Sequence, residues 1–283
     1  MKQLPNKIIM DIEKALQELT NTIKKVSFSP KLDSEILIMK ALKISRAYLY
    51  THKNKKLSSQ EEKILMKLCK RRMKKEPVAY ITGKKEFWSR EFIVTTDTLI
   101  PRPESELLVE EALKLIQGNP SMRILELGTG CGAIAISLAL EKKRTSIMAT
   151  DISQKALDQA IKNVHQYNVK NIQFIKSNWF EKIKEKEFDL IVCNPPYIKE
   201  EDPSLKELTF EPQLALTSGN DGLEAIRHIS ANAKEYLSHN GVLMLEHGNT
   251  QEKKVAQILA EKKWKNITCI KDLRRFPRVT VAK

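Results

Sequence analysis

The chain is predicted to be an α/β protein in which a Rossmann-like, doubly wound sheet follows a small N-terminal helical bundle. Apolar residues recur at helical spacing up to about residue 75. Between residues 122 and 193, short apolar strands alternate with helical segments, which is typical of a parallel sheet. Two later runs, at residues 264–270 and 278–281, indicate a closing antiparallel hairpin.

Charge is distributed unevenly along the chain. The 283 residues are 41% hydrophobic, which is enough for a sizeable core and argues against global disorder. The formal net charge is +14, and residues 1–80 hold 19 Lys and Arg against 8 Asp and Glu, a net +11. Such a balance favours an acidic partner such as RNA, the ribosome or an acidic protein surface. A lysine-rich, solvated surface without a partner is the alternative.

The four cysteines indicate a reducing compartment. None belongs to a Cys-x-x-Cys pair and no histidine lies at ligand spacing from one, so neither a metal site nor a disulfide framework is predicted. The beginning of the chain lacks a long apolar run, so we expect neither a signal peptide nor a membrane span. These features predict a cytoplasmic protein.

Four helices are predicted in the N-terminal bundle. Ser29-Pro30 ends the first helix, and the second begins at Lys31. Ser45 and Ser58 are candidate N-caps of the third and fourth helices. The apolar face of the first helix consists of Ile8, Ile9, Ile12, Leu16 and Leu19. The end of the fourth carries a basic cluster of Lys63, Lys67, Lys70, Arg71, Arg72, Lys74 and Lys75.

From Pro77 the pattern changes to short strands. Tyr80-Ile81, Glu86–Trp88 and Glu91–Val94 are predicted to be strands, with turns between them. The predicted parts of the chain are a helical domain that docks the substrate, a β-hairpin linker and a sheet domain, at residues 1–76, 77–100 and 101–283.

Arg102 is held between two prolines in the segment Leu99–Glu106. The prolines make this segment stiff and extended, and a helix follows to about Ile116. A guanidinium fixed in this way could pair with a carboxylate or line a cleft. Arg102 is therefore a candidate substrate-binding residue.

A glycine-rich turn follows the first strand of the sheet domain. The strand at 122–127 contains Glu126 near its end, and a helix starts at Ala133. Between them, the turn consists of Gly128, Thr129, Gly130, Cys131 and Gly132. Glycines let the backbone approach a ligand and direct free N–H groups at it. Asp151, at the end of the next strand, is placed to hold a ribose. NAD and S-adenosylmethionine both remain possible on this pattern alone.

The stiff turn Asn194-Pro195-Pro196-Tyr197 favours S-adenosylmethionine. It ends the apolar strand 188–193, at the sheet edge where ligands bind in open α/β sheets. The lone pair of an amide or exocyclic amine is delocalised, so such a nitrogen is a poor nucleophile. Oxygens of Asn194 and Pro195 could accept its two hydrogens and aim the lone pair at a sulfonium methyl, while Tyr197 stacks on the planar group. Glu126, before the glycine turn, could reach the cationic end of that cofactor. A plain proline-rich strand end is the alternative for the turn alone.

The remaining segments complete the sheet domain. A strand at 172–175 leads to Asn178-Trp179, and the polar segment 198–220 is long enough for a lid or binding loop. A helix at 223–237, a strand at 241–246 and a helix at 253–263 precede the closing hairpin.

Together these motifs resemble the bacterial N5-glutamine methyltransferases that modify peptide chain release factors. The resemblance covers essentially the whole chain and is carried by Pro77–Phe87, Leu99–Glu106, Glu126–Gly132 and Asn194–Tyr197. The Asn-Pro-Pro-Tyr turn alone is shared with adenine methyltransferases and some RNA guanine methyltransferases. The helical domain followed by Ile-Pro-Arg-Pro-Glu, and Glu211-Pro212 after the turn, are more specific.

The resemblance implies a class I methyltransferase fold that uses S-adenosylmethionine and releases S-adenosylhomocysteine. Its substrate would be the glutamine of the Gly-Gly-Gln loop in class 1 release factors, whose methylation modulates translation termination. Gly128 to Gly132 would wrap the methionine part of the cofactor, Asp151 would bind the ribose, and Trp179 would pack on the adenine. Asn194 to Tyr197 would hold the glutamine amide, with Asn194 also touching the cofactor.

One position departs from the family pattern. Asn178 stands where the family usually has Asp, so the adenine would meet a neutral acceptor in place of a charged one. A neutral hydrogen bond contributes about 0.5–1.5 kcal/mol and a charged one about 1.5–3 kcal/mol, so a modest loss of cofactor affinity is expected.

Two other functions remain open. One is an N-methyltransferase acting on an exocyclic amine of RNA or DNA, and the other is a basic RNA-binding protein with an inactive methyltransferase fold. The basic domain has few aromatic residues on which bases could stack, so nucleic acid is a possible but not a required partner. The chain is expected to act as a monomer.

Overall fold

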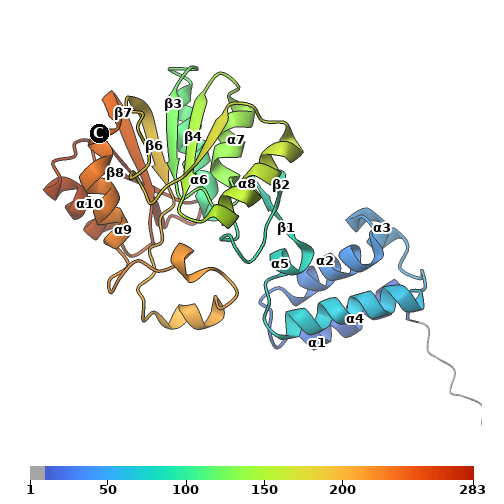
Figure 1. Ribbon diagram of the computed structural model, residues 1–283. Coiled ribbons are helices and arrows are strands. Elements are labelled where there is room, and N and C mark those ends of the chain that lie inside the picture. Colours follow the sequence, from blue (N-terminus) through green and yellow to red (C-terminus); the bar gives the residue numbers. More distant parts are fainter. Residues whose placement is uncertain (1–9) are drawn as a thin grey trace, which may run out of the picture. The chain divides into compact units, whose positions relative to one another are not determined.

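The computed structural model describes residues 10–283, which form two compact units, one ending at Gly83 and the other spanning Lys84–Lys283 (Figure 1). Each unit has its own hydrophobic core and is described by itself. Ile8 and Ile9, predicted on the first helical face, lie outside the described residues.

The N-terminal unit is a bundle of helices with capped starts. The Asp11 side chain accepts a hydrogen bond from the backbone N–H of Lys14, and Ser45 caps the third helix. Ser58 and Glu61 form a reciprocal capping box, which satisfies two backbone donors at the start of the fourth helix. The helices are α1 (Ile12–Ile23), α2 (Pro30–Leu42), α3 (Arg46–Thr51), α4 (Ser59–Met73) and α5 (Val78–Thr82).

The strand predicted at Tyr80-Ile81 is wrong, because both residues lie in the short helix α5. Pro77 precedes this helix and Gly83 ends it with φ +76°, a backbone conformation that glycine adopts without strain. Tyr80 and Ile81 are both buried. Two adjacent apolar residues predicted a strand from the sequence. In the structure, a single turn of helix buries both side chains.

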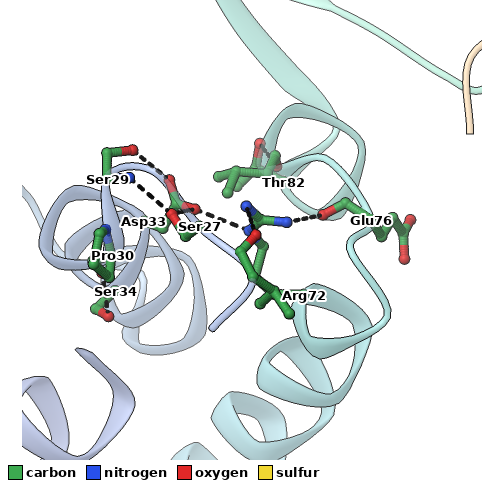
Figure 2. A network of polar contacts seen from close by, with 10 residues as sticks. Ser27, Ser29, Pro30, Asp33, Ser34, Arg72, Glu76 and Thr82 are labelled. Atoms are coloured by element: carbon green, nitrogen blue, oxygen red, sulfur yellow. Dashed lines mark hydrogen bonds and ion pairs between the residues drawn. The ribbon is translucent and has the colours of Figure 1, made fainter. Parts of the chain in front are cut away.

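Arg72 joins α4 to α2 inside the N-terminal unit (Figure 2). Its Nε atom donates to Asp33 Oδ2 at 2.9 Å, and its Nη2 atom donates to the backbone oxygen of Val26 at 2.8 Å. Ser27 donates to the same Asp33 oxygen at 2.7 Å. The Arg72 and Asp33 side chains are only 12% and 11% exposed. Arg72 is therefore a structural residue, although the sequence placed it in a basic surface cluster.

The second unit contains a two-stranded hairpin and a seven-stranded sheet. The hairpin pairs β1 (Lys84–Phe87) with β2 (Arg90–Ile93) in antiparallel register. The strands of the large sheet are β3 (Arg123–Leu127), β4 (Ser146–Asp151), β5 (Ile172–Lys176), β6 (Phe188–Cys193), β7 (Leu237–Glu246), β8 (Thr268–Lys271) and β9 (Pro277–Ala282). The helices are α6 (Glu106–Ile116), α7 (Ala133–Glu141), α8 (Gln154–Tyr167), α9 (Glu224–Asn232) and α10 (Glu252–Glu261).

The order of the strands is β5-β4-β3-β6-β7-β9-β8. The first five are parallel, and β9 pairs antiparallel with both β7 and β8. The predicted doubly wound sheet with a C-terminal antiparallel hairpin is thus confirmed. Because the five parallel strands run in one direction, the loops after β3, β4, β5, β6 and β7 all leave the same edge of the sheet.

Helices cover both faces of this sheet (Figure 1). Leu125, Ile191 and Leu243, from three central strands, share a core with residues of α9 and α10. Alternate residues point to the opposite face, where α6 packs on α7 and against β7. Glu126 and Glu246 lie on this second face by alternation.

Two predicted boundaries in the C-terminal part are wrong. Leu237, predicted to end a helix, begins strand β7, since α9 stops at Asn232 and a 3₁₀ turn follows. Trp264, predicted to begin a strand, precedes β8; it is 5% exposed, and its indole nitrogen donates to the backbone oxygen of Ser230 at 2.9 Å. In both places tertiary packing sets the boundary.

No helix in the described part of the chain is both long and apolar enough to cross a bilayer. Nor do residues 10–283 contain a group of three or more His, Cys, Asp or Glu side chains placed to hold a metal ion.

Arg72→Met should destabilise the protein. Methionine keeps the apolar stem but leaves the Asp33 carboxylate largely buried without its cation, which costs about 3 kcal/mol or more. The exposed neighbour Lys70 provides the matched control, because Lys70→Met should change stability by less than about 0.5 kcal/mol. Urea unfolding followed by circular dichroism measures both. Equal midpoints for the two variants would contradict the structural role of Arg72.

Candidate active site

The glycine turn after β3 contains three residues with left-handed backbone conformation. Gly128, Gly130 and Gly132 have φ values of +71°, +57° and +82°. A Cβ atom at Gly132 would lie 2.9 Å from Cδ1 of Ile136, so glycine is also needed there for packing. At Gly128 and Gly130, in contrast, no atom of the described residues other than the adjacent ones in the chain lies within 4 Å of such a Cβ. The turn therefore has one packed side and one open side, and the open side can admit a ligand.

A buried carboxylate holds the turn in place. Glu126 is 1% exposed, and its Oε2 atom accepts hydrogen bonds from the Thr129 hydroxyl at 2.6 Å and from the backbone N–H of Ala135 at 3.2 Å. Burial raises the pKa of Glu126 to about 8, and these two donors oppose the shift. Glu126 thus joins β3, the turn and the first turn of α7.

Asp151 connects the same turn to the end of β4. Its Oδ2 atom accepts a hydrogen bond from Gly130 N at 2.9 Å, and its Oδ1 atom accepts one from Ser153 N at 2.9 Å. Burial raises the pKa of this carboxyl group. A carboxylate has about four lone-pair sites, so Asp151 retains acceptor capacity for ribose hydroxyls.

Asn163 is a buried residue of α8 that sequence reasoning missed. Its Nδ2 atom donates to the backbone oxygens of Cys131 at 2.9 Å and Ile93 at 3.0 Å, and its Oδ1 atom accepts from Ile93 N at 2.9 Å. It therefore ties the glycine turn to strand β2. Cys131 itself is 2% exposed, and burial raises the pKa of its thiol to about 12, so the thiol is unreactive.

Asn178 and Trp179 follow β5. The side-chain nitrogen of Asn178 donates to Glu181 at 2.7 Å, which leaves its oxygen available as an acceptor. Trp179 is partly buried, has a φ of +49°, and lies 6.4 Å from the His228 ring between centroids. It also packs on the core under α9 and α10, so only part of its surface is available to a ligand.

The turn after β6 begins beside the glycine turn. Cys193 pairs with Leu127, so Asn194 and Gly128 leave the sheet at neighbouring positions. Asn194 Nδ2 donates to Ser105 Oγ at 2.9 Å. Pro195 is buried, and Pro196 and Tyr197 are half-buried.

Two residues that sequence reasoning missed fix the backbone of Tyr197. Gln251 Nε2 donates to Tyr197 O at 3.0 Å, while Gln251 Oε1 accepts from Gly248 N at 2.8 Å. A Cβ atom at Gly222 would lie only 2.3 Å from Tyr197 O. Burial raises the pKa of the Tyr197 phenol well above its ordinary value. A cavity of about 330 Å³ lies beside Tyr197 and is lined also by Lys199, Asp221 and Gln251.

Arg102 pairs with a carboxylate, which was one of its two predicted roles. Its Nη2 atom lies 2.5 Å from Glu211 Oε1, and Glu211 Oε2 accepts from Ile100 N at 3.1 Å. The Glu211 side chain is 2% exposed and that of Arg102 is 32% exposed. Glu211 therefore anchors the segment before α6 to the long loop after β6, and the guanidinium retains an exposed face.

Gly222→Ala should destabilise the turn after β6. The added methyl would meet Tyr197 O, and the φ of +76° disfavours any residue with a Cβ, so a cost above about 1 kcal/mol is expected. Gly118→Ala is the control, because its φ is ordinary and the nearest atom would lie 3.7 Å away. Urea unfolding compares the two. A Gly222→Ala protein as stable as the control would show that the turn relaxes freely.

Comparisons with known proteins agree with this architecture. Residues 14–83 match the family model of the PrmC N-terminal domain, and residues 103–211 match that of the methyltransferase small domain. The release factor glutamine methyltransferase of Coxiella burnetii is 42% identical over 275 residues, covering 97% of this chain and 99% of the relative. That of Shewanella oneidensis is 40% identical, covering 96% of both chains.

The large sheet also resembles solved methyltransferases. A methyltransferase from Pyrococcus furiosus superposes with a TM-score of 0.52 at 15% identity, over 70% of this chain and 90% of that one, which supports the fold alone. The extent of the relatives' similarity, together with the two domain matches, settles the assignment: the chain belongs to the release factor glutamine methyltransferase family.

Proposed function

We propose that this protein transfers a methyl group from S-adenosylmethionine to the side-chain amide nitrogen of the glutamine in the Gly-Gly-Gln loop of class 1 release factors. The observation that carries the proposal is the placement of Asn194 and Gly128 at adjoining strand ends. This arrangement sets an amide-binding turn beside a turn suited to a cofactor. The curated relatives from Coxiella and Shewanella bear the name of this activity.

The cofactor fits the open side of the glycine turn. Gly128 and Gly130 leave free space where a side chain would otherwise stand, and the backbone there can meet the methionine part. Asp151 is assigned to the ribose, and Trp179, with the oxygen of Asn178, to the adenine. Glu126 and Cys131 hold the turn from its packed side, together with Thr129 and Gly132. When bound, S-adenosylmethionine supplies an electrophilic methyl group on a sulfonium.

The turn after β6 is assigned to the substrate amide. Asn194 Oδ1 and the Pro195 carbonyl accept the two hydrogens of the glutamine amide, and Tyr197 covers its planar face beside Pro196. Holding both hydrogens turns the nitrogen lone pair toward the methyl donor, and such positioning can contribute about 7–11 kcal/mol in favourable systems. The proton can leave after transfer, so no general base is required. When the methyl is transferred, the C–S bond electrons return to sulfur and the sulfonium leaves as a neutral thioether; it needs no Lewis acid to leave, so a metal is not required either.

Substrate choice can be tested with labelled S-adenosylmethionine. We expect label in a class 1 release factor, and none in its loop variant with Gln replaced by Ala or in bulk RNA or DNA. Label in nucleic acid but not in the release factor would instead favour an RNA or DNA amine methyltransferase.

Asn194→Ala should lower transfer by about 100-fold or more, because the substrate amide loses its acceptor, while calorimetry still detects weakened cofactor binding.

We further propose that the basic face of α4 docks the protein substrate and that the enzyme acts as a monomer. Two of the predicted cationic residues are engaged internally: Arg72 with Asp33, and Arg71 with Glu76 at 2.5 Å. A groove of about 440 Å³ around Met66 is instead lined mainly by exposed lysines, namely Lys63, Lys67 and Lys70 of α4 and Lys74 just after it, with Arg71 also contributing to the lining. An apolar side chain ringed by lysines suits an acidic protein surface with an apolar contact at its centre.

Charge reversal at Lys63, Lys67 and Lys70 together should raise the KM for the release factor by about tenfold, because attraction to an acidic partner is lost. Cofactor affinity should not change. The matched control reverses Lys143, Lys170 and Lys184, three exposed lysines in the loops before β4, β5 and β6, at the opposite edge of the sheet from the site. Steady-state kinetics of both triple variants test the proposal, which fails if they have equal KM values.

A further inference from the structure

Glu246 is a buried carboxylate that the proposed function leaves unused. It ends β7, is 0% exposed, and neither of its oxygens has a hydrogen-bond partner of ordinary geometry among residues 10–283. Leaving a buried charged group without partners is costly. A carboxylate in this position therefore calls for an explanation in terms of its neighbours.

Its neighbours belong to the substrate turn. Leu245 pairs with Cys193, so Glu246 lies beside Asn194 at the same sheet edge. Ser105, just before α6, is 3% exposed and accepts the side-chain N–H of Asn194. Burial raises the pKa of Glu246 to about 7. The Ser105 and Tyr197 hydroxyls, which lie near the carboxylate without reaching hydrogen-bond geometry, and the charge of Arg278 lower this pKa, whereas the charge of Glu104 raises it. Burial, followed by the charges of Glu126 and Glu246, raises the pKa of the Cys193 thiol.

A serine hydroxyl can donate only one hydrogen bond, and this limits how Asn194 can be arranged. If the Ser105 hydroxyl donates a hydrogen bond to Glu246, the Ser105 oxygen can only accept a hydrogen bond from Asn194. The amide of Asn194 must then present its nitrogen to Ser105 and its oxygen away from it. If Glu246 is neutral or absent, the hydroxyl is free to donate to Asn194 Oδ1, and the flipped amide becomes equally acceptable.

We propose that Ser105 and Glu246 are positioning residues that fix the orientation of the Asn194 amide, so that its oxygen faces the glutamine substrate. This inference rests on the proposed function, in which Asn194 Oδ1 accepts a substrate N–H. A flipped Asn194 would offer a donor to a donor and would repel the substrate amide. When ionised Glu246 accepts a hydrogen bond from the Ser105 hydroxyl, a bond that the present side-chain positions do not make, it selects the productive orientation of the Asn194 amide.

Ser105→Ala should lower kcat for release factor methylation by about 10- to 100-fold, because misoriented groups cost this much, and should leave the Kd for S-adenosylmethionine within about twofold. Ser105→Thr, which keeps the hydroxyl, should retain most of kcat. Ser137→Ala is the matched control, because Ser137 is 0% exposed and its hydroxyl donates only to the backbone oxygen of Ala133 in its own helix. Full kcat in Ser105→Ala, or an equal loss in Ser105→Thr, would overturn the proposal.

Glu246→Gln supplies a second readout that loss of stability would not mimic. In the native enzyme, kcat should rise as the pH passes through about 7, because only ionised Glu246 enforces the orientation. The pH profile of Glu246→Gln should lack this rise. Glu126 also has a raised pKa, but it is present in both proteins and cannot cause a difference between their profiles. Because Glu246 acts through Ser105, the double variant with Ser105→Ala should be no slower than Ser105→Ala alone. An unchanged pH profile or fully multiplicative losses would remove Glu246 from the mechanism.

Asn194→Ala separates the two levels of the argument. If that variant keeps full activity, the proposed function of the turn is wrong. If it loses activity while Ser105→Ala and Glu246→Gln do not, only the positioning role is wrong.

Discussion

The buried carboxylate of Glu126 is the interaction on which the rest of the site depends. One of its oxygens binds both the Thr129 hydroxyl and the first turn of α7, so the strand, the turn and the helix cannot move independently. Asp151 then extends the same network to β4 through Gly130. Parallel strands deliver all these groups to a single edge, and Asn194 arrives there because β6 pairs directly with β3. The hydrogen bonds that hold the glycine turn in place thus leave its open side free.

Much of this arrangement could be predicted from sequence, because its signals are local. Glycines before a helix, Asp151 after a strand and an Asn-Pro-Pro-Tyr turn each carry their meaning within a few residues. The alternation of strands and helices then fixes which ends share an edge. The strand predicted at Tyr80-Ile81 was wrong because its signal was too short. Two apolar residues do not distinguish a strand from one helical turn, and burial of both side chains decided between the two.

The residues that could not be predicted act at a distance along the chain. Asn163 binds Ile93, which is 70 positions away, and Gln251 binds the backbone of Tyr197, which is 54 positions away. Neither lies in a recognisable motif, and an isolated Asn or Gln on a predicted helix reads as a surface residue. Gly222 is required only because the backbone of Tyr197 passes close to it in space. Such constraints arise from packing and have no period or spacing in the sequence.

The internal engagement of Arg71 and Arg72 has a consequence for how the basic unit can meet other molecules. Its outward charge is left mainly to lysines, whose ammonium groups are strongly hydrated point charges on flexible stems. Such groups attract over distances of about one Debye length, roughly 8 Å at physiological ionic strength, but do not impose the two-pronged geometry of a guanidinium. The lysines of the unit are therefore suited to accelerating encounters in a salt-sensitive way. In the proposed function, selectivity then falls to short-range hydrogen bonds at the sheet edge, which ionic strength hardly affects.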